Sequence, residues 1–197
     1  ETIATKAKSI ELLRAPGLKT LPIRNVHALP NFSFYSKKSL KENALGTQDA
    51  HVWLDPKNAK AIVNTIVRVL SSIDQTNKST YHSNGLYTLK RLDGLSIDIA
   101  AILAPVRNQK FVAFHDAFQY FERSYGLMTA GVVTISPEVI PGANRIKKIR
   151  AKIKASGVSC VFAEPQFSSK LVTTITNGTS AKTGIADPLG SNFNAGS

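Results

Sequence analysis

The first strong pattern of apolar and polar positions predicts a helix over residues 56–72. Asp55 stands before it as a helix cap, and Pro56 takes the first helical position, where proline is tolerated. Apolar side chains then return every three or four residues, which places them on one face of a helix. They are Ala59, Ile62, Val63, Ile66, Val67 and Leu70.

A second apolar stripe predicts a longer helix over residues 78–103. Leucines and isoleucines keep helical spacing through this stretch, although Gly85 and Gly94 lie inside it. Pro105 ends the helix, because proline has no N–H to continue the hydrogen-bond ladder.

After residue 105 the pattern alternates between short β-rich runs and helical ones. The predicted strands cover residues 110–114, 132–135, 158–163 and 183–186, and the predicted helices cover residues 116–125, 143–155 and 166–176. This alternation predicts an α/β fold with a parallel sheet covered on both faces. Right-handed crossovers place the carboxyl ends of the strands on one edge, where open α/β sheets bind ligands.

Composition narrows the class of protein. A chain of 197 residues with 43% hydrophobic residues has enough apolar material for one generous domain or two small ones. Its longest apolar run, over residues 97–106, is broken by Asp98 and Pro105, so we expect no membrane-embedded segment. Residues 1–14 lack the layout of a secretory signal, which leaves a cytosolic protein or one whose signal has been removed.

The single cysteine, Cys160, excludes an internal disulfide and a site with several thiolate ligands. Any metal must therefore bind imidazole and carboxylate groups. Within an apolar strand Cys160 is typical of a small buried hydrophobic residue. Neither a Gly-x-Ser-x-Gly nucleophile motif nor a glycine-rich phosphate loop is present, so acyl transfer and nucleotide chemistry have no support.

The net charge of +12 raises the alternative of a partner such as nucleic acid, an anionic membrane or an acidic protein. Six lysines and arginines fall within residues 145–154, but isoleucines recur among them at helical spacing. No aromatic residue stands between them to stack on bases. The run is therefore typical of a solvated helix face, and nucleic-acid binding is left as non-specific attraction.

Two of the four histidines stand where a metal site is expected. His51 comes just before the helix cap Asp55, and His115 follows the strand at 110–114. Each has an aspartate close by, and carboxylates commonly orient metal-binding imidazoles. The alternative is that both are ordinary loop histidines. His27 and His82 have no carboxylate within a few residues, so we expect neither to bind metal.

Two acidic residues stand at strand exits on the same predicted edge. Asp187 follows the last strand, so His51, His115 and Asp187 can converge in one cleft, although Asp-Pro also commonly begins turns. Glu164 follows the strand at 158–163. We interpret it as a structural or supporting group, with capping of the next helix as one role.

These segments together resemble the periplasmic zinc-binding proteins of bacterial ABC importers, within the wider zinc and manganese solute-binding group. The resemblance runs from about residue 49 to residue 192. It rests on residues 49–56 (DAHVWLDP), 114–127 (FHDAFQYFERSYGL), 160–167 (CVFAEPQF) and 187–190 (DPLG).

The resemblance implies two α/β lobes with mostly parallel sheets, joined by a long rigid helix, with one metal in the cleft between them. In this chain the implied parts are a partial first lobe at residues 1–77, the linking helix at 78–104 and the second lobe at 105–197. His51, His115 and Asp187 match the family's ligands, the last of which serves in some members.

Manganese-preferring relatives carry glutamate at the position of His115. Imidazole suits Zn²⁺ and oxygen donors suit Mn²⁺, so the resemblance implies zinc and makes manganese less favoured.

The chain also departs from the family pattern. A further histidine ligand, expected early in the first lobe, has no counterpart, and a lysine-rich segment at residues 31–48 replaces the family's histidine-rich loop. We expect the chain to begin partway through the first lobe. We also expect it to stop before the family's final helix and before the cysteine that pairs with Cys160 in relatives.

The implied function is capture of Zn²⁺ in the periplasm and its delivery to the membrane permease of an ABC importer, without enzymatic activity. Two other classes are kept as alternatives. One is a zinc hydrolase in which Asp116 or Glu164 serves as the base. The other is the basic nucleic-acid-binding module.

Overall fold

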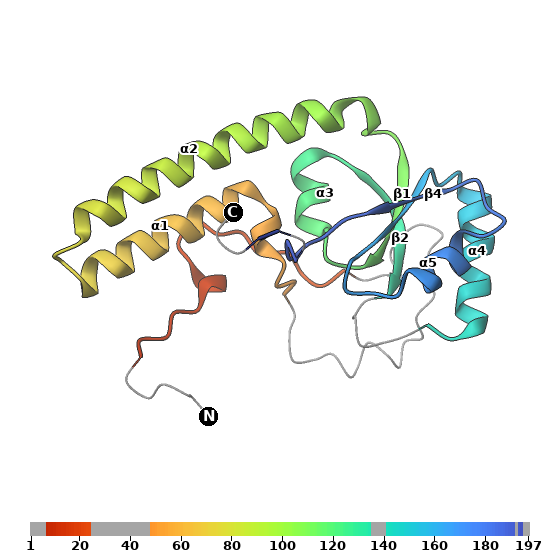
Figure 1. Ribbon diagram of the computed structural model, residues 1–197, viewed down its shortest axis with the longest axis horizontal. Coiled ribbons are helices and arrows are strands. Elements are labelled where there is room, and N and C mark those ends of the chain that lie inside the picture. The colour runs from red at the N-terminus through yellow and green to blue at the C-terminus, as the bar shows by residue number, and fades with distance from the viewer. Residues whose placement is uncertain (1–6, 25–47, 135–140, 192, 195–197) are drawn as a thin grey trace.

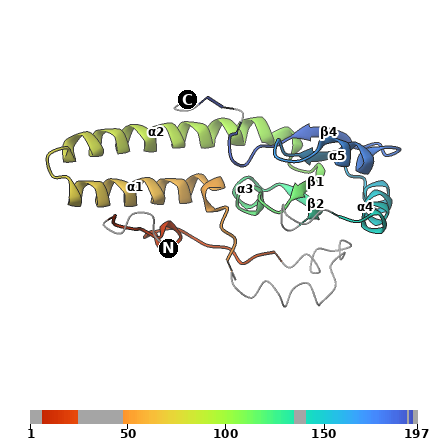
Figure 2. The same cartoon turned by 60° about the horizontal axis from the view of Figure 1, so that its bottom comes forward.

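The computed structural model describes residues 7–24, 48–134, 141–191 and 193–194. Two long helices, α1 (Pro56–Ile73) and α2 (Lys78–Leu103), pack side by side and lead into an α/β unit (Figures 1 and 2). The predicted start of α1 is confirmed in detail, because Asp55 Oδ1 accepts a hydrogen bond of 2.8 Å from the amide of Lys57. Within the described ranges, no helix is both long and apolar enough to cross a membrane.

The close packing of α1 on α2 explains one of the two helical glycines. A Cβ atom on Gly85 would lie 2.6 Å from Val67 Cγ2, so a side chain there would push the helices apart. Gly94 has open space around it. The prediction of a continuous helix through both glycines is confirmed.

A four-stranded parallel sheet forms the centre of the α/β unit. It contains β1 (Lys110–His115), β2 (Met128–Thr134), β3 (Cys160–Ala163) and β4 (Lys182–Ile185), in the order β2-β1-β3-β4. Every pairing is parallel, so the predicted sheet type is confirmed.

The main core lies between one face of this sheet and two helices, α4 (Ala143–Ser156) and α5 (Ser169–Thr176). Because side chains alternate along a strand, Val112 and Phe114 of β1 enter this core while Phe111 and Ala113 face the opposite side. A short helix, α3 (Gln119–Tyr125), follows β1 and ends at Gly126 in the left-handed conformation.

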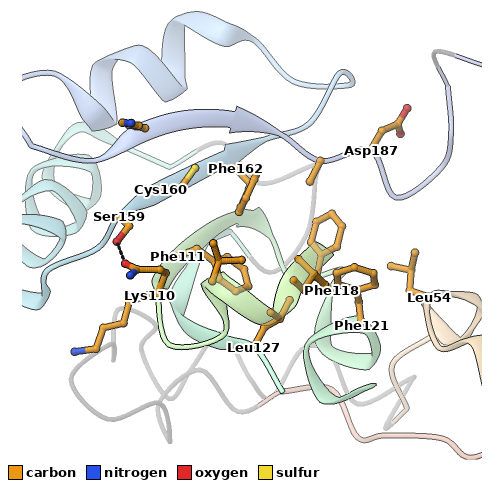
Figure 3. A pocket seen from close by; sticks show the side chains of 15 residues that line it. Leu54, Lys110, Phe111, Phe118, Phe121, Leu127, Ser159, Cys160, Phe162 and Asp187 are labelled. Atoms are coloured by element: carbon orange, nitrogen blue, oxygen red, sulfur yellow. Dashed lines mark hydrogen bonds between the residues drawn. The ribbon is translucent and has the colours of Figure 1, made fainter. Parts of the chain in front are cut away.

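The opposite face of the sheet borders an apolar hollow of about 560 Å³. Figure 3 shows Phe111, Phe118, Phe121 and Phe162 around this hollow, between the sheet and α3. Its lining is almost entirely hydrocarbon, so it offers little to a metal ion.

The predicted element limits differ from the structure mainly at their ends. The helix predicted from residue 116 starts at Gln119, because residues 116 and 117 form the turn that leaves β1. The strand predicted from residue 132 starts at Met128, because Met128 of the edge strand β2 already pairs with Lys110 of β1. The division into parts at residues 77 and 104 stays a prediction.

Candidate metal centre

His51 lies in the tight turn that precedes α1, and Asp49 holds it there. Asp49 Oδ1 accepts a 2.9 Å hydrogen bond from the amide of His51 and lies 2.7 Å from its ring nitrogen Nδ1. Burial alone would raise the pKa of Asp49, but the hydrogen bonds from His51 and Gln119 outweigh it and hold that pKa below its ordinary value. Asp49 is therefore ionised at neutral pH, and the His51 ring donates to it through Nδ1.

His115, the last residue of β1, is held in the same way by Glu164. Its Nδ1 lies 2.9 Å from Glu164 Oε2 and 3.0 Å from Oε1, and its amide donates to Oε1 at 3.1 Å. Glu164 is 3% exposed and follows β3, the strand beside β1. The expected supporting role of Glu164 is thus seen as a direct hold on His115. It does not cap α5, whose N-cap residue is Ser168.

The rings of His51 and His115 lie side by side although the two residues are far apart in the sequence. Their centroids are 5.1 Å apart, with the planes inclined at 63°. In each ring Nδ1 points to a buried carboxylate, so Nε2 is the nitrogen left for another partner. This arrangement of carboxylate and histidine is the one in which proteins usually prepare imidazole to bind a metal.

Asp187 follows β4 at the same edge of the sheet, but its carboxylate is engaged locally. It accepts hydrogen bonds from Gln166 Nε2 at 3.0 Å, Ser191 Oγ at 2.8 Å and the amide of Leu189 at 3.1 Å. Figure 3 shows this carboxylate turned away from Phe118 and Phe121. Within the described part of the chain, no three His, Cys, Asp or Glu side chains gather as a metal site. The ligand role of Asp187 stays a prediction.

The loop that carries Asp187 is nevertheless tied to the segment that carries His51. Trp53 Nε1 donates a 2.9 Å hydrogen bond to the carbonyl oxygen of Pro188, and the Trp53 ring lies 5.4 Å from the ring of His51. Trp53 therefore links the loop that follows β4 to the segment that carries His51.

The sequence reasoning missed an arginine beside this pair. Arg24 contacts two buried carboxylates, with Nη2 2.7 Å from Glu122 Oε2 and Nε 3.3 Å from Asp116 Oδ1. Burial raises the pKa of Asp116 to about 6 against the lowering effect of Arg24, and burial likewise raises the pKa of Glu122. No sequence pattern signals this cluster, because Arg24 lies far from its partners along the chain and has no helical or strand spacing to them.

The other residues weighed from the sequence lie away from the pair. His82 is exposed on α2, and His27 lies outside the described residues. Cys160 is half-buried beside the apolar hollow, and burial raises the pKa of its thiol.

The basic stretch on α4 behaves as the helix face that its spacing predicts. Ile149 and Ile153 are buried in the core, while Arg145 donates to the carbonyl oxygen of Val133 and Arg150 to that of Asn177. Arg145 and Arg150 therefore stabilise the fold through hydrogen bonds to backbone carbonyl groups.

Comparison with known proteins identifies the family. The family described as "Zinc-uptake complex component A periplasmic", ZnuA, matches residues 5–196. A high-affinity zinc uptake system protein ZnuA from Brucella abortus (strain 2308) is 46% identical over 151 residues, which is 77% of this chain and 45% of the relative. This chain belongs to the ZnuA family.

The fold agrees with solved structures of ZnuA and related solute-binding proteins. A crystal structure of ZnuA has a TM-score of 0.71 and 28% identity, over 93% of this chain and 64% of that one. The protein FpvC from Pseudomonas aeruginosa in complex with Mn²⁺ has a TM-score of 0.64 and 31% identity, over 74% of this chain and 55% of that one. The chain spans about half the length of the curated ZnuA relatives that it matches.

Proposed function

We propose that this chain captures Zn²⁺ in the periplasm for delivery to the membrane permease of an ABC importer, with His51 and His115 as metal ligands. The observation that carries the proposal is that a buried carboxylate contacts the ring nitrogen Nδ1 of each histidine. Asp49 and Glu164 occupy both Nδ1 atoms. Each Nε2 then keeps its lone pair for a metal, as zinc coordination requires.

The distance between the rings fits one shared zinc ion. With zinc–nitrogen bonds of about 2.0–2.1 Å and tetrahedral angles, two imidazole ligands have their centroids about 5 Å apart. The observed separation is 5.1 Å. Asp187 is proposed as a third donor, which must leave its present partners Gln166 and Ser191 and turn toward the rings when zinc binds.

Zinc is favoured over manganese by the chemistry of the donors. Two neutral imidazoles form a borderline donor set that suits Zn²⁺, whereas Mn²⁺ prefers carboxylate, carbonyl and water oxygens. Manganese is kept as the second candidate, because FpvC, which was solved with Mn²⁺, is similar to this chain.

A binding role is favoured over catalysis because both candidate bases are engaged. A zinc hydrolase needs a carboxylate that is free to take a proton from a metal-bound water. Asp116 pairs with Arg24, and both oxygens of Glu164 hold His115. Membership of a zinc-uptake family points the same way, toward transport.

A competition titration tests the proposal. The purified chain is titrated with Zn²⁺ in the presence of a chromophoric chelator, and the titration is repeated with Mn²⁺. We expect one zinc ion per chain, binding far tighter than manganese, and weaker zinc binding on acidification because a protonated imidazole is no ligand. Equal or tighter manganese binding would support the second candidate, and absence of any zinc binding would reject metal capture by this chain.

A further inference from the structure

Arg24 belongs to a set of contacts that fastens the segment bearing His51 to the unit bearing His115. Residues 21–24 form a segment beside residues 48–51, with an antiparallel bridge between Pro22 and Gln48 and a 2.8 Å hydrogen bond from the amide of Asp49 to Leu21 O. Whatever fixes the first segment therefore also fixes the second.

Helix α3 receives these two segments through side chains. The hydroxyl of Tyr120 accepts a hydrogen bond of 2.8 Å from the amide of Leu21 and donates one of 2.7 Å to Asp49 O. Gln119 Nε2 donates to Pro22 O at 3.0 Å and to Asp49 Oδ2 at 3.1 Å. Three of these bonds join neutral groups, and the fourth is accepted by the ionised carboxylate of Asp49.

Arg24 adds the charged part of the attachment. Its side chain is 11% exposed and reaches both Asp116, the residue after His115, and Glu122 on α3. A small cavity of about 210 Å³ is lined by Arg24 together with Asp49, His51 and Asp116, so the guanidinium lies at the border of the candidate metal centre.

The charges explain why a cation is needed at this place. Asp49, Asp116 and Glu122 are all buried, Asp116 and Glu122 contact Arg24, and Asp49 and Asp116 line one small cavity with it, so their negative charges repel one another at short range. Without a cation among them, separation of the two segments would relieve this repulsion and bring water to the carboxylates. The planar guanidinium reaches two carboxylates at once, which an ammonium group does less well.

We propose that Arg24 is a positioning residue of the metal site, which holds His51 at coordination distance from His115 by pairing with Asp116 and Glu122 across the two segments. This role rests on the proposed function for its consequence, which is tighter metal binding. The ring contact that it maintains exists without metal and is measurable by itself.

The test compares Arg24→Met/Glu122→Gln with the wild type. The double variant removes the guanidinium and also one of the carboxylates that it would leave buried and unpaired, so the fold is less disturbed than by Arg24→Met alone. Arg24→Lys is the second variant, because it keeps the positive charge but not the planar guanidinium that reaches two carboxylates. Arg14→Met is the control, since Arg14 is exposed and pairs with exposed Glu11.

Three quantities are measured: the urea midpoint of unfolding, the nuclear Overhauser contact between the rings of His51 and His115 in the metal-free protein, and the dissociation constant for Zn²⁺. We expect the double variant to fold, to lose the ring contact and to bind zinc about tenfold or more weakly. Arg24→Lys is expected to lie between it and the wild type, and Arg14→Met to match the wild type.

The outcomes separate this inference from the proposed function. A ring contact and a zinc affinity that are unchanged in either folded Arg24 variant would overturn the positioning role. A wild-type chain that shows the ring contact but binds no zinc would reject the proposed function, and the loss of that contact in the Arg24 variants would still decide the role of Arg24.

Discussion

Glu164 holds His115 at two points, with its carboxylate against the ring nitrogen Nδ1 and against the backbone amide of the same residue. His115 ends β1 and Glu164 directly follows β3, the neighbouring parallel strand, so the sheet itself sets their separation. A side chain held in this way would need little rearrangement to bind a metal as proposed.

Replacement of Glu164 by glutamine is expected to weaken zinc binding about 10- to 100-fold while the chain stays folded. Glutamine retains the size of the side chain but loses the charge that orients the ring and increases its basicity. Calorimetry with a competing chelator measures the change. Glu11→Gln, at an exposed position, serves as the control. An unchanged affinity in Glu164→Gln would show that the carboxylate has no part in preparing His115.

Replacement of His115 by glutamate is expected to change the preference between metals. The substitution exchanges a borderline nitrogen donor for hard oxygen donors, and the ratio of zinc to manganese affinity should therefore fall. Competition titration with both ions measures this ratio. A ratio equal to that of the wild type would contradict a ligand role for His115.

The fold was largely predictable because its signals are local. Asp55-Pro56 and the apolar spacing after it predict α1, and strands that alternate with helices predict the parallel sheet. Errors fell at element ends, where pairing across the sheet decides the limits, as it does for Met128 opposite Lys110.

The site was predictable only in part, because its contacts are long-range. His51 and His115 were selected by their places beside a helix cap and a strand end, and their rings do meet, while their role as ligands stays a prediction. The attachment through Arg24 and Tyr120 was missed, since nothing in the spacing of these residues indicates that a distant segment folds against α3. The carboxylate of Asp187 accepts hydrogen bonds within its local turn, and in the part of the chain that the structure describes no group of three ligands forms, so its ligand role stays a prediction.

The packing of α1 against α2 yields a prediction for the two helical glycines. Gly85→Ala is expected to lower the free energy of unfolding by about 1–3 kcal/mol, because the added methyl meets Val67 at 2.6 Å. Gly94→Ala is the matched control and should raise it by about 0.5–1 kcal/mol, since nothing lies within 4 Å and alanine favours the helix. Urea unfolding measures both. Similar changes in the two variants would refute the tight contact.

The stability of the turn between α1 and α2 should depend on pH, because that turn contains the titratable carboxyl group of Asp74. Hydrogen bonds from the Asn77 side chain and from the Tyr81 hydroxyl hold the pKa of Asp74 below its ordinary value of 3.8. A carboxyl whose folded pKa is lowered stabilises the fold above its ordinary pKa, and this contribution disappears as the pH falls through the lowered value.

Asp74→Asn should therefore be less stable than the wild type at pH 7 and at pH 5, with the difference shrinking toward pH 3. Denaturant unfolding at the three pH values measures it. A difference that stays constant down to pH 3 would show that the charge of Asp74 makes no contribution.

The most direct test of the account is zinc titration of His51→Ala and His115→Ala beside His82→Ala, the last being an exposed histidine on α2 that serves as the control. If the two neighbouring imidazoles hold the ion, each of the first two variants loses most of its zinc affinity and His82→Ala binds as the wild type does. Zinc affinity that survives in either His51→Ala or His115→Ala would contradict a metal site built on this pair.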